Sequence, residues 1–384
     1  MLEHRFLLDD AVRNRAFRRA IRAQVKPGDR VFDLGCGMGV LGFFALQAGA
    51  AHVFGVDADE VLDSARDLAA ANGWADRTDY RRAAAADVRP PRRADWLLVE
   101  WLGPMGLNEW PLASLADSVR RFLRPGGATI PARVDHYVAP VEAGAAWEET
   151  VGFWSGARYG LDLRLGKALA VRRAHPVGIP PDALLAPAAR WLSLNLRSLD
   201  REEPLPAEGG EASFDLPRDG LFHGLACWFE ADLGARVRLT NAPGAPPTHW
   251  NQAFLPLPRP VRTRAGDRLE VRLGACTVGR RSGPVWSIGM FRGARRVLFH
   301  EAPGPASTLS IDEAARLTGN FVPLRGPAEE RLALLLSLPD GRLSAREAAA
   351  EAARLRPDLF AGEEEALAGL VRAWRGRPLR AGAK

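Results

Sequence analysis

One stretch of the sequence decides the fold class: Arg30-Val-Phe-Asp-Leu-Gly-Cys-Gly-Met-Gly39. Its first five residues form a short apolar run typical of a buried strand, and its glycines then let the backbone turn sharply into an apolar helix that reaches Gly49. Further strands are predicted over His52–Val56 and Asp95–Val99, with helices between them. Strands that alternate with helices indicate a parallel, doubly wound sheet, in which ligands bind at the carboxyl ends of the strands.

The flanking segments complete the domain plan. Residues 4–24 have apolar side chains at near-helical spacing and predict one helix, while a Pro125-Gly-Gly127 turn and a strand into Pro131 close the first domain. Beyond this proline, short β-like runs separated by Pro and Gly indicate an antiparallel barrel or sandwich. The predicted fold class is therefore α/β followed by β, with a Rossmann-like domain over 1–131, a β-barrel domain over 132–304 and a helical extension over 305–384.

The extension carries two helix signals. Ser344 and Glu347 have the spacing of a capping box that opens an Ala-rich helix, and Glu363–Trp374 has an amphipathic pattern. With the Leu-Pro-Asp-Gly turn at 338–341, these helices fit either a small winged-helix-like module that recruits a partner or a simple packing appendage. We favour the appendage.

Composition excludes several classes of protein. The chain has 384 residues, 47% of them hydrophobic, with 11 Trp and 16 Phe, which indicates two or three folded domains rather than a disordered chain. No run of about 18 apolar residues predicts a membrane helix, and the N-terminus lacks the order of a signal peptide. Three widely separated cysteines and scattered histidines predict no disulfide framework, no metal site and a cytoplasmic location.

The net charge of +6 raises the question of nucleic acid. All but three of the 52 basic residues are Arg, and they alternate with acidic residues without forming a basic block. This pattern indicates a compositional bias rather than a nucleic-acid surface. A catalytically silent module that binds nucleic acid is kept as the alternative from another class, and it predicts strongly salt-dependent binding.

The glycine loop predicts a ligand that contains a nucleoside. Gly35 and Gly37 belong to a GxGxG pattern rather than the GxGxxG of dinucleotide loops, and Asp33 lies two residues before the first glycine. This variant fits a cofactor with an amino-acid tail beside a nucleoside, such as S-adenosylmethionine. Asp57, at the end of the next strand, would accept both ribose hydroxyls, which fits NAD equally well. NAD and a glycine turn without a ligand stay open, and Asp33 either contacts the ligand or fixes the loop by bonding backbone amides.

Several separated motifs resemble, in the same order, those of the protein arginine methyltransferase family, over roughly residues 4–300. They are the N-terminal run 4–17, the glycine motif 31–41, the loop from Glu100 to Glu109, the Thr248-His-Trp250 loop, and the proline at position 131, where the chain of the family leaves its nucleotide-binding domain. The resemblance implies transfer of a methyl group from S-adenosylmethionine to an arginine guanidinium. It also implies a homodimer made through an arm around residues 152–176.

The resemblance assigns roles to single residues as well. His4 would touch the cofactor, and Arg13 would hold its carboxylate. His249 would pair with Asp10, and the pair would either accept the proton after transfer or lock the N-terminal helix over the cofactor; we favour the lock. Trp250 would line the channel that receives the acceptor arginine, or it would belong to the core of the barrel.

Two glutamates suit the implied chemistry. A protonated guanidinium has no free lone pair and is a poor nucleophile. Glu100 and Glu109, gripping it through paired hydrogen bonds, would draw positive charge toward one nitrogen so that another could attack the methyl group. A cation between the two carboxylates also relieves the repulsion that would raise the pKa of one of them. The alternative is that both are solvated loop acids.

The acceptor is left open because the sequence departs from the family within the glutamate loop. Pro104, Met105 and Gly106 stand where family members tend to have aromatic residues. An arginine in a protein, in a peptide or in a small molecule therefore fits. The runner-up is a methyltransferase of the same architecture that acts on a small natural-product nucleophile, and it predicts that Glu109→Gln leaves turnover largely intact.

Overall fold

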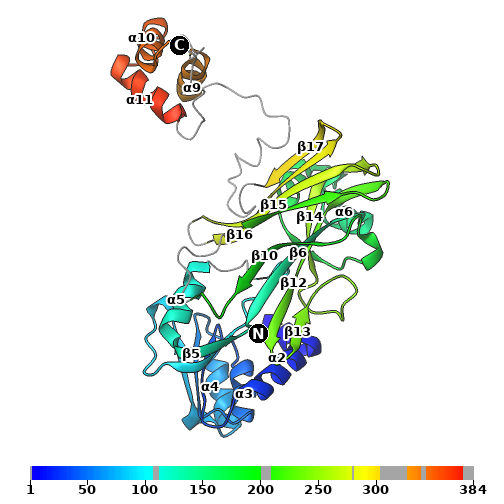
Figure 1. The fold of residues 1–384 in the computed structure, drawn as a ribbon, viewed down its shortest axis with the longest axis vertical. Helices are drawn as coiled ribbons and strands as arrows, with labels where there is room; N and C mark the ends of the chain where they lie inside the picture. The colour runs from blue at the N-terminus through cyan, green and yellow to red at the C-terminus, as the bar shows by residue number, and fades with distance from the viewer. Residues whose placement is uncertain are drawn as a thin grey trace. The chain divides into compact units, whose positions relative to one another are not determined.

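The structure is a computed structural model that describes residues 2–106, 112–199, 209–278, 281–302, 327–338 and 343–374. The chain divides into two compact units, residues 1–318 and 319–384. The first unit combines a five-stranded parallel sheet with a six-stranded and a four-stranded antiparallel sheet, and the second consists of helices in its described part (Figure 1).

The parallel sheet has five strands in the order β3-β2-β1-β4-β5. The strands are β1 (Arg30–Leu34), β2 (His52–Asp57), β3 (Thr78–Arg82), β4 (Ala94–Val99) and β5 (Leu123–Ile130), and the connecting helices are α3 (Val40–Gln47), α4 (Leu62–Ala71), α5 (Leu112–Phe122), η1 (Ala75–Arg77) and η2 (Ala85–Asp87). The predicted parallel, doubly wound sheet is thus confirmed. Strand order reverses between β1 and β4, so the glycine turn after β1 lies at the switch point where such sheets bind ligands.

The single helix predicted over residues 4–24 is wrong, because the chain breaks at Asp10. The break separates α1 (Leu2–Asp9) from α2 (Ala11–Gln24). Asp10 is the N-cap of α2, and its Oδ1 accepts a hydrogen bond from the Arg13 amide at 2.8 Å. A capping carboxylate satisfies a free amide of the first turn, so a new helix begins here although the apolar spacing continues across the break.

The turn predicted at residues 125–127 is also wrong, because these residues lie within β5. Gly126 has a φ of +77°, and the pairing of β4 with β5 slips between Ala94 and Trp96. The Pro and Gly residues therefore make a bulge in a continuous strand rather than ending a helix and opening a turn.

Two antiparallel sheets make up the rest of the first unit. The six-stranded sheet contains β6 (Arg133–Val141), β9 (His175–Val177), β10 (Ala189–Asn195), β12 (Gly220–Gly234), β13 (Val237–Thr240) and β14 (Gln252–Thr263); the four-stranded sheet contains β11 (Gly209–Asp215), β15 (Arg268–Val278), β16 (Arg281–Arg292) and β17 (Arg295–Ala302). Side chains from both sheets, such as Leu225 and Val271, meet in one buried cluster. The predicted antiparallel domain is confirmed, with its described strands in these two sheets and in one two-stranded hairpin over residues 157–162.

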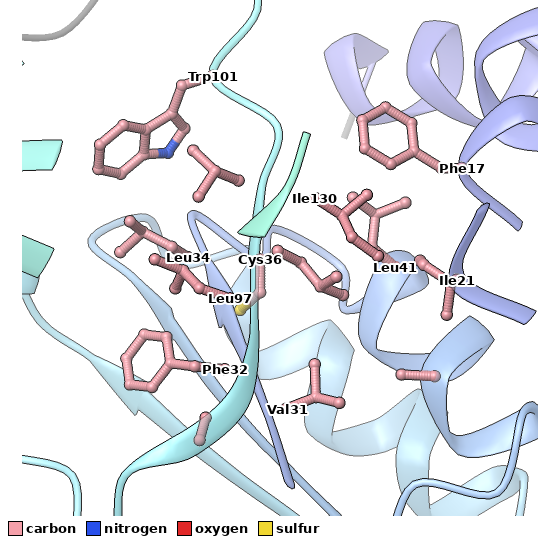
Figure 2. Packing of buried hydrophobic residues seen from close by; sticks show 14 of the residues in the cluster. Phe17, Ile21, Val31, Phe32, Leu34, Cys36, Leu41, Leu97, Trp101 and Ile130 are labelled. Carbon is pink, nitrogen blue, oxygen red and sulfur yellow. The ribbon is translucent and has the colours of Figure 1, made fainter. Parts of the chain in front are cut away.

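One hydrophobic core joins the parallel sheet to the first antiparallel sheet. Phe17 of α2 and Phe32 of β1 belong to the same buried cluster as Phe229 of β12 and Trp250. Figure 2 shows side chains of α2, β1, α3 and β4 gathered in this cluster. Burying a large apolar side chain contributes roughly 1.5–3 kcal/mol, so this core fixes the loop at residue 250 relative to the carboxyl edge of the parallel sheet.

The segment predicted as an arm projects a small hairpin. It contains η3 (Gly152–Ser155), β7 (Ala157–Arg158), β8 (Leu161–Asp162) and α7 (Arg164–Ala170); α6 (Gly144–Thr150) precedes it and η4 (Pro181–Ala183) follows it. Tyr159 is at the tip of the β7–β8 hairpin and is 99% exposed, and Leu161 beside it is 61% exposed.

The second unit contains three described helices, α9 (Pro327–Ser337), α10 (Ala345–Leu355) and α11 (Glu363–Trp374). The predicted capping box is confirmed, since the Glu347 amide donates to Ser344 Oγ at 3.2 Å and the Ser344 amide donates to Glu347 Oε2 at 2.7 Å. Leu335, Phe360 and Leu370 are among the residues of its small core. None of the helices in the described part of the chain has the length and hydrophobicity that crossing a bilayer requires.

Candidate active site

A cavity of about 110 Å³ lies beside the glycine turn, at the carboxyl edge of the parallel sheet. All six residues predicted to bind the cofactor line it, namely His4, Arg13, Asp33, Gly35, Gly37 and Asp57, and so does Glu100. These residues come from α1, α2, β1, the turn after β1, and the ends of β2 and β4. The fold therefore gathers the candidates at one place, although they are spread over almost a hundred residues.

The glycine turn needs glycine for two reasons. Gly35, Gly37 and Gly39 have φ values of +69°, +50° and +81°, a region that other residues rarely adopt. In addition, a Cβ on Gly35 would lie 2.3 Å from Trp101 Nε1, and one on Gly37 would lie 2.9 Å from His4 Cε1. The turn thus presents bare backbone to the cavity.

The carboxylate of Asp57 is oriented by two backbone amides. Its Oδ2 accepts from Gly37 N at 2.8 Å, and its Oδ1 accepts from Asp59 N at 2.9 Å. A carboxylate oxygen can accept more than one hydrogen bond, so Asp57 keeps the capacity to accept from hydroxyl groups of a ligand.

Asp33 serves the glycine turn and lines the cavity at the same time. Its Oδ2 accepts from Gly42 N in the first turn of α3, at 2.9 Å. Burial raises the pKa of this carboxyl to about 7; the hydrogen bond from Gly42 opposes the rise, and the negative charge of Asp57 adds to it. The backbone bond matches one of the two predicted roles of Asp33, and its place in the cavity leaves the other role open.

A buried ion pair joins Arg13 to Glu100. Arg13 Nε donates to Glu100 Oε2 at 2.8 Å, and Nη2 donates to the same oxygen. Both groups are almost fully buried, so removing either partner would leave an uncompensated charge. Arg13 does not use the second oxygen, Oε1. The sequence analysis missed this pair, because a single sequence carries no signal that relates residues 87 positions apart.

The structure brings Asp10 and His249 together, as predicted. His249 Nδ1 lies 2.7 Å from Asp10 Oδ2, and the His249 amide donates to the same oxygen at 3.0 Å. Burial alone would raise the pKa of Asp10, but the hydrogen bonds from Arg13 N and from both His249 groups outweigh it and lower the pKa. Because Asp10 also caps α2, this carboxylate ties the loop at residue 249 to the start of that helix.

Trp250 belongs to the core shared by the parallel sheet and the first antiparallel sheet. It is buried, and its ring meets Phe229 edge to face at a centroid distance of 5.2 Å. This core includes the parallel sheet, so it is not the core of the barrel alone, and a role of Trp250 beside the acceptor arginine stays a prediction.

Glu109, the second predicted carboxylate, lies outside the described residues. The loop that leads to it is described as far as Gly106. Gly103 and Gly106 exchange two backbone hydrogen bonds of 2.9 Å and close a tight turn. Met105, at the tip of this turn, is 1% exposed and belongs to the core between the two antiparallel sheets. Through the side chain of Met105, the loop after Glu100 therefore packs into the core between the two antiparallel sheets.

The cavity suits a ligand that carries both charges and hydroxyl groups. Arg13 presents a guanidinium, which pairs well with carboxylates. Asp33, Asp57 and Glu100 present acceptors for ammonium and hydroxyl groups. Among the described residues, no group of three or more His, Cys, Asp or Glu side chains could hold a metal ion.

Comparisons with known proteins agree on one group of enzymes. A model described as the arginine methyltransferase oligomerization subdomain matches residues 132–279, and a model of ribosomal protein L11 methyltransferase matches residues 18–132. Protein arginine N-methyltransferase 2 of Xenopus tropicalis is 30% identical over 280 residues, which are 69% of this chain and 64% of the relative. Probable histone-arginine methyltransferase 1.3 of Arabidopsis thaliana is 33% identical over 285 residues, which are 71% of this chain and 53% of the relative. The chain thus spans between about half and two thirds of these two relatives.

Solved structures share the fold. The Trypanosoma brucei PRMT1 enzyme-prozyme heterotetrameric complex with AdoHcy has a TM-score of 0.67 and 25% identity, and the match covers 78% of this chain and 96% of that chain. Arabidopsis thaliana protein arginine methyltransferase 10 has a TM-score of 0.65 at 20% identity with the same coverage, which shows the fold alone. Together with the motifs, these matches show that the chain is similar to the protein arginine methyltransferase family in both its parallel-sheet and its antiparallel part.

Proposed function

We propose that this protein transfers a methyl group from S-adenosylmethionine to a guanidinium nitrogen of arginine. The observation that carries the proposal is the gathering of all six cofactor candidates and Glu100 around one cavity. Relatives named as arginine N-methyltransferases support it. A protein or peptide is the acceptor class that those names favour, and a small arginine-containing molecule stays a further possibility from the sequence.

The cavity fits the groups that the cofactor carries. Arg13 suits the carboxylate of its amino-acid tail, Asp33 suits the ammonium group, and Asp57 suits the ribose hydroxyls. At Gly37 the His4 ring packs directly against the bare backbone, where an added Cβ would lie 2.9 Å from His4 Cε1. When bound, S-adenosylmethionine supplies an electrophilic methyl group on its sulfonium sulfur.

Cofactor binding is expected to release a proton from Asp33. Its pKa of about 7 means that the group is largely protonated at pH 6, and a neighbouring ammonium favours the ionised form. We expect about one proton released per ligand at pH 6, falling toward zero above about pH 8. Isothermal titration calorimetry of S-adenosylmethionine in two buffers of different ionisation enthalpy measures this number.

Asp33→Asn is the control for this titration, because it keeps the shape of the side chain and removes its proton. The variant should show no pH-dependent release. Its stability should also lose a pH dependence: the folded state of the natural protein binds more protons than the unfolded state between about pH 4 and 7, so Asp33 lowers the free energy of unfolding as pH rises through that range. Equal proton release in both proteins would contradict the assignment.

Glu100 is the group we assign to the acceptor. Arg13 binds Oε2 of Glu100 and so orients the carboxylate, which leaves Oε1 to accept from the substrate guanidinium. Glu109, whose role stays a prediction, would complete the grip. Two carboxylates localise positive charge on the nitrogens that they bind, so the remaining nitrogen regains lone-pair character. Holding this nitrogen in line supplies much of the rate, since orientation is worth roughly 7–11 kcal/mol in favourable cases.

Methylation of a guanidinium nitrogen forms one N–C bond, breaks the bond between the methyl carbon and the sulfonium sulfur so that S-adenosylhomocysteine leaves, and releases one proton from the methylated nitrogen. The Asp10–His249 pair is one candidate acceptor. Its contacts support the alternative more strongly, since Asp10 simultaneously caps α2 and accepts two hydrogen bonds from His249. We therefore assign the pair the role of a lock that holds the N-terminal helices beside the loop of residues 248–250.

Mass spectrometry of acceptors after incubation with S-adenosylmethionine tests the proposal. We expect a gain of one or more methyl groups on arginine residues of Arg-containing peptides, and none on matched peptides in which Lys replaces Arg. Free arginine tests the small-molecule class. Methyl transfer to an oxygen or carbon nucleophile alone, with Glu109→Gln still active, would support the runner-up and reject arginine as the acceptor.

We propose a homodimer formed through the segment 152–176. This segment lies within the match to the oligomerization subdomain, and it carries the exposed apolar side chains of Phe153, Tyr159 and Leu161. Apolar groups clustered at an exposed tip mark an interaction surface. We also propose the division into domains at residues 131 and 304, with the helical unit as an appendage.

Replacing the tip of the hairpin should give a monomer. Tyr159 has a φ of +54°, which Asn tolerates, so Tyr159→Asn with Leu161→Asn removes apolar contact without changing the turn. We expect association weaker by about 100-fold or more, as for hot-spot residues. Sedimentation velocity at micromolar concentration measures it, with Leu332→Asn on α9 as an exposed apolar control. A monomeric natural protein, or a dimer that survives the double change, would contradict the assignment.

A further inference from the structure

One buried amide side chain connects three segments of the active-site region. Asn241 follows β13 and is only 2% exposed. Its Nδ2 donates to the carbonyl of Pro104 at 2.9 Å and to the carbonyl of Asn251, and its Oδ1 accepts from the Phe229 amide at 2.9 Å. Asn241 thus bonds the loop after Glu100, the loop after His249 and strand β12 at once.

Asn241 is itself held in place. Gln252 Nε2 donates to the backbone carbonyl of Asn241 at 2.5 Å, and Gln252 Oε1 accepts from the Ile179 amide at 2.7 Å. A side chain fixed in this way acts as a rigid anchor, because rotating it would leave several buried polar groups without partners.

The anchored carbonyl lies between the two predicted carboxylates in the sequence. Pro104 is four residues after Glu100 and five before Glu109. It sits in the tight turn from Gly103 to Gly106, which inserts Met105 into the β domain. Fixing the turn at Pro104 fixes residues 103–106, the end of the described part of the loop that begins at Glu100.

The chemistry of Asn suits this position. At this position two backbone carbonyl oxygens need hydrogen-bond donors and one backbone amide needs an acceptor. An amide side chain supplies both. A carboxylate would supply the acceptor but would place an oxygen against two carbonyl oxygens. A hydroxyl side chain is shorter and has a single proton to donate.

We propose that Asn241 is a positioning residue for the loop after Glu100: by holding the Pro104 carbonyl it fixes residues 101–106, and so the backbone next to Glu100, relative to strand β12 and the loop after His249. The proposal rests on the proposed function insofar as Glu100 binds the guanidinium of the acceptor. The positioning itself is a property of the loop and can be measured without any acceptor.

Asn241→Asp isolates the donor, since it keeps the shape of the side chain and the acceptor for the Phe229 amide. We expect kcat for arginine methylation to fall by about 100-fold, the effect of a misplacement of about 1 Å, while the Kd for S-adenosylhomocysteine stays within about threefold. Asn241→Ser, which retains one donor, should fall between this variant and the natural protein and serves if Asn241→Asp does not fold. Asn195→Ala, an exposed change in β10, is the matched control.

Hydrogen exchange supplies the second readout. Amides of residues 101–106 should exchange about tenfold faster or more in Asn241→Asp than in the natural protein, with residues 35–42 unchanged. If the natural protein proves not to methylate arginine, the proposed function fails, and faster exchange in the variant still supports the anchor. Unchanged exchange in residues 101–106, or a kcat within twofold of the natural protein, would overturn the assignment of Asn241.

Discussion

Glu100→Gln is expected to lower kcat for arginine methylation by about 1,000-fold, an effect comparable to the loss of a preorganised group at a reacting centre. The guanidinium would lose the carboxylate that localises its charge, and a neutral amide cannot replace that charge. Steady-state kinetics with an Arg-containing peptide measures the change.

Gln keeps the shape of Glu and an oxygen that can still accept from Arg13, but it leaves the buried charge of Arg13 uncompensated, so we expect a folded protein of lower stability. Binding of S-adenosylhomocysteine should be retained, since its carboxylate would compensate the charge of Arg13. Glu142→Gln is the control: this glutamate is exposed and pairs with Arg218 at 3.4 Å, outside the cavity. Activity of Glu100→Gln above a tenth of the natural rate would remove Glu100 from the proposed chemistry.

Gly106→Ala is expected to lower the free energy of unfolding by about 3–5 kcal/mol, since backbone strain and overpacking act together. Gly106 has a φ of +105°, and a Cβ there would lie 2.4 Å from Cδ2 of the buried His136 ring and 3.3 Å from Phe229. Neither neighbour has space to move, because both are in the core. Urea unfolding followed by circular dichroism measures the loss.

Gly28→Ala separates the two causes. Gly28 has a similar φ of +92°, but no atom lies within 4 Å of its added Cβ. It should therefore cost only the strain of the backbone, about 1–2 kcal/mol. Equal losses for the two variants would show that the Gly103–Gly106 turn is not packed against His136 as described.

The parallel sheet could be predicted because its signals are local. An apolar run followed by glycines marked β1 and its turn, and the structure places β1 over the predicted residues, Arg30–Leu34. The places where a helix or strand is interrupted were harder to predict. Asp10 caps a helix in the middle of a continuous apolar pattern, and Gly126 makes a bulge where Pro and Gly favour a turn. In both cases the same residues suit two local structures, and the tertiary contacts decide between them.

The candidate site divides in the same way. Residues at strand ends, such as Asp33 and Asp57, could be placed from the sheet alone, and Asp10 and His249, 239 positions apart, could be paired only through the family resemblance. The Arg13–Glu100 pair and the hydrogen bonds of Asn241 could be predicted neither from the sheet nor from the resemblance. Arginine is common in this chain, and a single Asn beside a Pro-rich loop reads as a turn residue until the fold buries it.

The most direct test is a crystal structure of the protein with S-adenosylhomocysteine and an arginine peptide. We predict that the guanidinium lies between the carboxylates of Glu100 and Glu109, with Arg13 still bonded to Glu100. A guanidinium bound away from the glycine turn, or Glu109 directed away from Glu100 in that complex, would contradict the proposed chemistry.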